Sequence, residues 1–215
     1  MGVLIKWLSH SGFQISINET IVYVDLEENS PVTKKADVIL ITHSHFDHCH
    51  PAKVNEASKE STVIIAPEDC SSKLDKNVRT LKPGEEETYG KIKVRAVEAY
   101  NHKRFRSPGN PYHPKGFGVG YLIEADGKTI YHAGDTDFIP EMSELGSIDV
   151  ALLPSGDTYT MDNSDAAEAA LAINPKVAVP IHRWDTDPQE FKQKVEANSN
   201  ITVQVLREGE EYQVR

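Results

Sequence analysis

The sequence predicts an α/β protein in which β-sheets are covered by helices. Three observations support this prediction: strand-like segments outnumber helix-like ones, several of them are apolar throughout, and two late segments carry helix start signals. Runs of β-branched and apolar residues bounded by Gly, Pro, Asn or Asp are typical of strands. Because a sheet must bury its apolar face, we expect the helices to pack on the sheets.

The expected strands follow one another along most of the chain. Segments 13–17 and 91–97 alternate polar and apolar residues, which predicts half-buried antiparallel strands. Segments 37–42, 149–154 and 176–181 are apolar nearly throughout, as strands covered on both faces are. In chain order, the expected strands are 3–8, 13–17, 20–25, 36–42, 61–66, 91–100, 118–125, 128–133, 149–154, 176–181 and 201–206.

Two segments are predicted to be helices. Residues 162–172 begin with Asp162 as N-cap and carry Asp165 three positions later, where an acidic side chain favours a helix N-terminus. Residues 187–197 begin with Asp187 followed by a proline, which fits the first helical position. Both helices come late in the chain.

Length and composition narrow the classes of protein. At 215 residues, we expect a single domain over 1–215. No apolar run approaches the roughly 18 residues that cross a bilayer, so a cytoplasmic protein without a membrane partner is expected. The net charge of −10 disfavours nucleic acid as a partner and favours a small-molecule substrate. Cys49 and Cys70 are expected to be reduced thiols. The sequence leaves the oligomeric state open.

Polar side chains follow several buried strands at the point where each strand ends. They are His43, His102, Asp135 and His182. Loops at the carboxyl ends of strands converge on one crevice in α/β proteins, so we expect these side chains to form one site. Residues two apart on an extended backbone point the same way, which lets His43 and His45 bind one ion together. Imidazole and carboxylate ligands suit a cation such as Zn²⁺.

The segment "THSHFDH" (42–48) resembles the HxHxDH signature of the metallo-β-lactamase superfamily. "AGDT" (133–136) and "PIH" (180–182) resemble later motifs of the same superfamily, in the expected order. "SHSGF" (9–13), "YHAGDT" (131–136) and "LPSGDTYTM" (153–161) are similar to motifs of its L-ascorbate-6-phosphate lactonase-like branch. The resemblance implies a four-layer αβ/βα sandwich of two pseudo-symmetric halves, roughly 1–100 and 116–215, with the metals at the sheet edge.

The same resemblance implies the ligands and the activity. One divalent ion would be bound by His43, His45 and His102, and a second by Asp47, His48 and His182, with Asp135 bridging both. Zinc is the expected metal, with Mn, Ni or Fe as alternatives. A hydroxide held between the ions would attack an ester, a lactone or a phosphodiester. The residues expected to serve catalysis are Asp47, Asp135 and His132.

Several histidines near these motifs allow more than one interpretation. His113 competes with His102 for the same ligand position, because both lie in one loop. His10 and His132 are expected near the site, where they would orient ligands or contact substrate, with a buried structural histidine as the alternative. His50 is expected outside the ligand set, and Cys49 is expected to be a small buried residue.

Two further features bear on the site and its surroundings. Asp25 ends an expected strand, and it either supports the metal-binding loop or is a simple turn residue. The acidic segments 84–90 and 208–212 are expected to be solvated turns.

The loop 102–116 carries four cations in an otherwise acidic chain: Lys103, Arg104, Arg106 and Lys115. It is either a solvated surface loop or a lid that attracts an anionic substrate.

Three alternatives to a small-molecule hydrolase remain to be weighed. One is a nuclease or phosphodiesterase of the same superfamily, and another is a non-catalytic metal-binding protein. A flavo-diiron redox enzyme is disfavoured because such enzymes carry Glu where this chain has His45.

Overall fold

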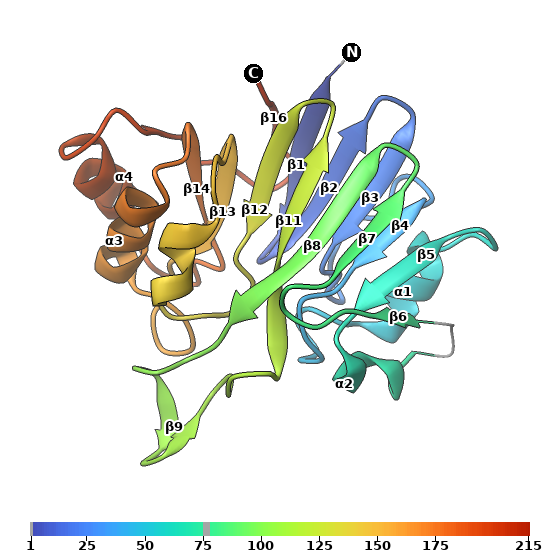
Figure 1. Ribbon diagram of the computed structural model, residues 1–215, viewed down its shortest axis with the longest axis horizontal. Coiled ribbons are helices and arrows are strands. Elements are labelled where there is room, and N and C mark those ends of the chain that lie inside the picture. The colour runs from blue at the N-terminus through green and yellow to red at the C-terminus, as the bar shows by residue number, and fades with distance from the viewer. Residues whose placement is uncertain (1, 75–77) are drawn as a thin grey trace.

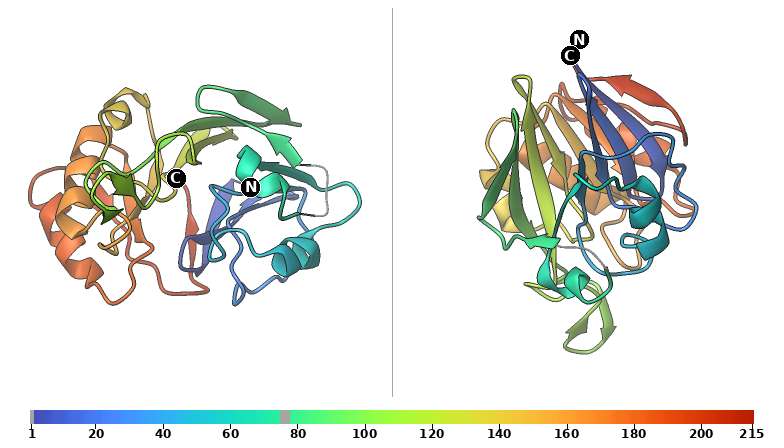
Figure 2. Two further views of the ribbon diagram at one scale, coloured as in Figure 1. Left: turned by 90° about the horizontal axis from the view of Figure 1, so that it is seen from below. Right: turned by 90° about the vertical axis from the view of Figure 1, so that its right-hand side faces the viewer.

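Two seven-stranded sheets form the centre of the protein (Figure 1). The computed structural model describes residues 2–74 and 78–215. The strand order is β16-β1-β2-β3-β4-β5-β6 in the first sheet and β15-β14-β13-β12-β11-β8-β7 in the second. Helices lie on the outer side of each sheet (Figure 2). The chain is therefore a mixed α/β protein of four layers, as the sequence predicts.

The first sheet combines an antiparallel part and a parallel part. Strands β1, β2, β3 and β16 pair antiparallel, whereas β3, β4, β5 and β6 pair parallel. The bounds are β1 (Val3–Ser9), β2 (Gly12–Ile17), β3 (Thr20–Val24), β4 (Val38–Leu40), β5 (Val63–Ala66), β6 (Val78–Thr80) and β16 (Glu211–Gln213).

The second sheet has the same mixed character. Strands β7, β8, β11 and β12 pair antiparallel, and β12, β13, β14 and β15 pair parallel. A small separate hairpin, β9 with β10, projects from the molecule between β8 and β11 (Figure 1). The bounds are β7 (Glu86–Tyr89), β8 (Ile92–Ala99), β9 (Phe105–Ser107), β10 (Asn110–Pro111), β11 (Gly118–Ala125), β12 (Lys128–His132), β13 (Val150–Pro154), β14 (Val177–Ile181) and β15 (Thr202–Val203).

Three apolar clusters hold the layers together. The largest lies between the two sheets and includes Ile5, Phe13 and Tyr121. The other two lie between each sheet and its helices. Strands β4, β13 and β14 are buried along their whole length, which confirms the prediction of strands covered on both faces.

The two predicted helices begin where the sequence predicts them, whereas the shorter helices of the described chain were not predicted. Helix α3 (Asn163–Ile173) is capped by the Asp162 carboxylate, which accepts hydrogen bonds from the backbone N–H groups of Ser164 and Asp165, both at 2.8 Å. Helix α4 (Pro188–Glu196) is capped by Asp187. The shorter helices are α1 (Pro51–Ala57), α2 (Glu68–Ser71) and the 3-10 helix η1 (Pro140–Glu144). No described helix is both long and apolar enough to span a membrane.

The structure corrects two expectations about the acidic segments. Residues 84–90 and 208–212 are not only turns, because they contain parts of β7 and β16. Both strands lie at sheet edges, where the backbone pairs on one side while charged side chains stay exposed. Charged edge strands of this kind protect a sheet from pairing with other chains.

The two sheets divide the chain differently from the predicted halves 1–100 and 116–215. Strand β8 lies within the predicted first half but belongs to the second sheet. Strand β16 lies at the end of the chain but pairs with β1 in the first sheet. Cys49 and Cys70 are both buried and unbridged.

Candidate metal centre

A cluster of histidines and aspartates lies where strands of both sheets end. His43 follows β4, Asp135 follows β12 and His182 follows β14, and all three are buried. Asp135 lies at the centre of the cluster. Its Oδ2 is 3.9 Å from His43 Nε2 and 3.2 Å from His182 Nε2, and its Oδ1 is 3.4 Å from His48 Nε2.

Three imidazoles form a first group of possible metal ligands: His43, His45 and His113. His45 Nδ1 lies 3.0 Å from His43 Nε2 and 3.2 Å from His113 Nε2, so the three nitrogens converge on one point. The His113 ring is held by Asn101, whose Oδ1 accepts hydrogen bonds from the backbone N–H of His113 at 2.9 Å and from its ring Nδ1 at 2.8 Å. This contact aims Nε2 at the group.

His113 therefore occupies the position for which the sequence analysis named His102. The backbone N–H of His102 donates to Asp137 at 2.7 Å, and its exposed ring places Nε2 2.8 Å from the carbonyl oxygen of Phe138. The ring thus points away from the cluster. The loop then returns, and Asn101 N–H donates to the carbonyl of His113 at 2.8 Å. This return places a residue eleven positions later in the site.

A second group contains His10, Asp47, His48 and His182. His10 Nε2 lies 3.3 Å from Asp47 Oδ2, and the rings of His10 and His182 are 3.8 Å apart. The carbonyl of His10 also accepts a hydrogen bond from the backbone N–H of His182 at 3.1 Å. His10 was expected only near the ligands, and the structure brings it among them. The sequence signal for His10 was its place in "SHSG", a turn between two apolar strands.

The donor set fits divalent metal ions. His10 Nε2, His48 Nε2 and Asp135 Oδ1 are buried and make no well-aligned hydrogen bond among the described residues, although each has a polar atom of the cluster 3.3 to 3.4 Å away. Buried polar atoms normally have partners, so atoms without one need another explanation. A metal ion between the groups would satisfy them, and imidazole with carboxylate is a suitable ligand set for zinc and similar metals.

Burial prepares most of these imidazoles to bind a cation. It lowers the pKa of His113 to about 4 and holds the pKa of His43 well below its ordinary value. Both rings are therefore neutral at pH 7, as a metal ligand must be. Burial alone would raise the pKa of Asp135, but His182 and His48 outweigh it and hold that pKa well below the usual range. The central carboxylate is ionised.

His48 and Asp47 complete the charge pattern. Burial alone would lower the pKa of His48, but the carboxylates of Asp135 and Asp25 outweigh it and raise that pKa well above the ordinary value. Burial opposes ionisation of Asp47, yet the contact with His10 lowers its pKa to about 2. Metal binding at the second group would therefore displace a proton from His48.

We expect the metal-free protein to lose stability as the pH falls from 6.5 to about 4. In this window the unfolded chain protonates His113, whereas the folded chain keeps it neutral, so unfolding is favoured. The contribution of His113 is about 3 kcal/mol over the window. Denaturant unfolding of chelated protein at several pH values would measure this loss. In His113→Gln, the slope of the unfolding free energy against pH should fall by the equivalent of about one bound proton. An unchanged slope in the variant would contradict the neutral buried ring.

Asp25 connects the ligand motif to the first sheet. Its fully buried carboxylate accepts hydrogen bonds from the backbone N–H and the hydroxyl of Thr42, each at 2.8 Å, and lies 2.7 Å from His48 Nδ1. Contact with Nδ1 leaves Nε2 of His48 free to face the cluster. Asp25 thus supports the metal-motif loop, one of the two roles that the sequence allows.

Replacing Asp25 by Asn should weaken both folding and metal binding. The amide nitrogen would oppose one of the three buried donors, at a cost of about 3 kcal/mol in unfolding free energy. Metal affinity should fall about 10- to 100-fold because His48 loses its orienting partner. Thermal unfolding and metal titration would measure both effects. The matched control is Asp126→Asn, at an exposed turn with a similar backbone φ of 52° against 48° for Asp25. Equal effects of the two substitutions would contradict this role.

The structure also corrects the expected catalytic role of His132. Its ring is fully buried, with Nε2 2.9 Å from the carbonyl of Ser11 and Nδ1 accepting a hydrogen bond from Gly134 N–H at 3.2 Å. Both ring nitrogens are therefore engaged by the backbone, and the ring holds the turn before Asp135 in place. His50 lies outside both ligand groups, as expected.

A cavity of about 330 Å³ opens over the cluster. Its floor carries His45, Asp47, His113, Asp135 and His182, and its rim carries Phe46, Arg106, Tyr159 and Trp184. A pocket of this size, with metal-ligating residues at its floor, suits a small-molecule ligand.

Comparison with known proteins agrees with the site. Residues 4–182 match the family model described as a beta-lactamase superfamily domain. The chain belongs to this superfamily. It is 32% identical over 222 residues to a UPF0173 metal-dependent hydrolase from Pelotomaculum thermopropionicum, covering 96% of this chain and 97% of the relative. Within the superfamily the chain is therefore a member of the UPF0173 family of metal-dependent hydrolases.

Solved structures of this superfamily have the same fold. A protein from Parabacteroides distasonis, described as a metal-dependent hydrolase, superposes with a TM-score of 0.89 at 38% identity, over 97% of this chain and 94% of that one. Igni18, a metallo hydrolase from Ignicoccus hospitalis, has a TM-score of 0.79 at 28% identity, over 98% and 97% of the two chains. The predicted superfamily and fold are confirmed. The more specific L-ascorbate-6-phosphate lactonase-like branch stays a prediction.

Proposed function

We propose that this UPF0173 protein holds two divalent metal ions and hydrolyses an ester, lactone or phosphodiester bond in a small substrate. The observation that carries the proposal is the arrangement of two ligand groups around one shared carboxylate, Asp135. In this proposal His43, His45 and His113 hold one ion, and His10, Asp47, His48 and His182 hold the other. Zinc is the first choice, with Mn, Ni or Fe as alternatives.

The metal supplies Lewis acidity, which activates water for attack and polarises the bond to be cleaved. The residues of the chain do the rest. Asp135 and Asp47 balance the positive charge, Asp25 orients His48, and Asn101 orients His113. The side chains of His43, His48 and Asp135 are buried, so that charge interactions among them are strong. The described site needs no serine or cysteine nucleophile for this chemistry.

The size of the cavity and the charge of the protein support a small substrate. The cavity volume of about 330 Å³ fits a compact organic molecule, and the net charge of −10 disfavours a nucleic acid. The complete set of candidate ligands favours an enzyme over a non-catalytic metal-binding protein.

Purified protein loaded separately with Zn²⁺, Mn²⁺, Ni²⁺ or Fe²⁺ should be assayed against three panels: aryl esters, lactones and bis(p-nitrophenyl) phosphate. We expect metal-dependent turnover in at least one panel, lost on chelation and restored by metal. Asp135→Asn is the inactive control. Fully loaded protein that turned over none of the three classes would contradict the proposal, and turnover confined to phosphodiesters would favour the phosphodiesterase alternative.

A further inference from the structure

The four cations of the loop 102–116 are not equivalent. Lys103 pairs with Asp165 at 2.9 Å, and Lys115 pairs with Glu141 at 2.9 Å and with Glu98 at 3.4 Å. The charges of these two lysines are compensated by carboxylates of α3, η1 and β8.

Arg104 is the most heavily paired of the four. Its guanidinium lies 3.1 Å from the buried Asp137 carboxylate and also pairs with Asp165, Asp162 and Asp157. This network ties the base of the β9–β10 hairpin to the start of α3. The base of the hairpin is therefore anchored to this part of the fold. The lid that the sequence analysis considered stays a prediction.

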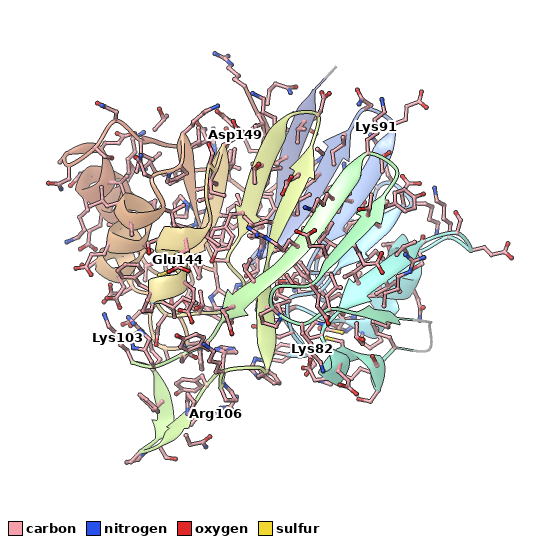
Figure 3. The ribbon with its side chains drawn as sticks, in the orientation of Figure 1. Lys82, Lys91, Lys103, Arg106, Glu144 and Asp149 are labelled. Carbon is pink, nitrogen blue, oxygen red and sulfur yellow. The ribbon has the colours of Figure 1, made fainter. Side chains whose placement is uncertain are left out.

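Arg106 is different. It pairs with no carboxylate among the described residues, and it lines the cavity over the metal centre. Its guanidinium carbon lies 5.3 Å from the centre of the Tyr112 ring, and its Nη2 lies 3.5 Å from His45 Nε2. Figure 3 shows Arg106 and Lys103 at the end of the molecule that carries β9. Arg106 is thus an uncompensated cation at the cavity rim.

His45 adds a second donor beside Arg106. Its Nδ1 faces His43 and His113, so its Nε2 is the nitrogen that faces the cavity. When Nδ1 serves as a ligand, the remaining ring proton lies on Nε2. The Arg106 guanidinium and His45 Nε2 then lie side by side and can only donate hydrogen bonds. An acceptor, preferably an anion, would pair with both.

Three exposed aromatic side chains line the same cavity as Arg106 and His45. Phe46 is 77% exposed, Trp184 55% and Tyr159 40%, and all three line the same cavity. Large apolar side chains gathered at a pocket rim usually contact a ligand or a partner. A planar or apolar group can pack against them while an anion reaches Arg106.

We propose that Arg106 is a specificity-determining residue that binds the carboxylate or phosphoryl oxyanion of a substrate whose apolar body packs against Phe46 and Trp184. This inference rests on the proposed function, because it names the substrate class of that site. The bidentate geometry of a guanidinium matches either oxyanion. Lys103, Arg104 and Lys115 have no part in binding, because their charges are already compensated.

Titration calorimetry of zinc-loaded protein with phenylphosphonate, which carries both an anion and a ring, would test the inference without requiring turnover. We expect Arg106→Gln to raise the Kd at least tenfold, Arg106→Lys to raise it less, and Lys115→Gln to leave it within twofold. Lys115→Gln removes the same charge from the same loop. The wild-type Kd should also rise with salt, and this dependence should shrink in Arg106→Gln.

A second titration separates the anion from the ring. Trp184→Ala should weaken phenylphosphonate but not methylphosphonate, whereas Arg106→Gln should weaken both. Equal affinity of wild type and Arg106→Gln for phenylphosphonate would overturn the inference, as would an equal loss in Lys115→Gln. Circular dichroism should show all variants folded, since these side chains are exposed. Inactive protein that still bound phenylphosphonate through Arg106 would contradict only the proposed function.

Discussion

Replacing Asp135 by Asn should remove both metal ions and reduce hydrolysis by about three orders of magnitude or more, which corresponds to about 4 kcal/mol. Asp135 lies between the two ligand groups, with its oxygens 3.2 to 3.9 Å from the ring nitrogens of His43, His48, His113 and His182. Asparagine keeps the shape but removes the charge that compensates two cations. Elemental analysis after gel filtration and steady-state kinetics would measure the two effects.

Asp149→Asn is the matched control for this substitution. Asp149 is also a buried carboxylate, and it accepts hydrogen bonds from Thr129 N–H at 2.8 Å and from Lys176 at 2.7 Å. It lies at the opposite end of the molecule from Arg106 (Figure 3). Asp149→Asn should lower stability and leave the metal content unchanged. Two ions retained in Asp135→Asn would show that this carboxylate is not shared.

Much of the fold could be predicted because its determinants are local. The strands β4, β13 and β14 are continuous apolar runs, and the caps Asp162 and Asp187 specify the first turns of α3 and α4. The acidic edge strands were missed because their stability comes from backbone pairing with β8 and β1, which composition does not reveal.

The site could be predicted where its residues share a motif or directly follow an apolar strand. His43, His45, Asp47 and His48 share one motif, and Asp135 and His182 each end a strand. His10 and His113 reach the cluster from irregular segments. The position of His113 depends on the return of the 102–113 loop and on its contact with Asn101, which are tertiary features. The sequence could therefore name His113 only as a competitor.

His132 is a second residue whose role depends on tertiary contacts that the sequence does not reveal. Its position before the turn that leads to Asp135 made a catalytic role plausible from sequence. Only the fold shows that Ser11, more than a hundred residues away, engages Nε2. A residue three positions before a candidate ligand can thus have both of its ring nitrogens engaged by the backbone.

The proposed two-metal centre is tested most directly by asking whether His113 or His102 is a metal ligand. The fold, and not a sequence motif, brings His113 to the cluster. His113 Nε2 lies 3.2 Å from His45 Nδ1 and 3.4 Å from Asp135 Oδ2, whereas His102 contacts the carbonyl of Phe138. Loss of His113 should leave the first ion with two imidazoles and weaken its binding by at least 100-fold. Loss of His102 should have no effect on either ion.

The decisive measurement is elemental analysis of gently purified wild-type protein beside the His113→Ala and His102→Ala variants. We predict close to two transition-metal ions per chain in the wild type and in His102→Ala, and close to one or fewer in His113→Ala. A loss of metal in His102→Ala with full retention in His113→Ala, or fewer than two ions in the wild type after metal supplementation, would contradict the two-metal centre proposed for this protein.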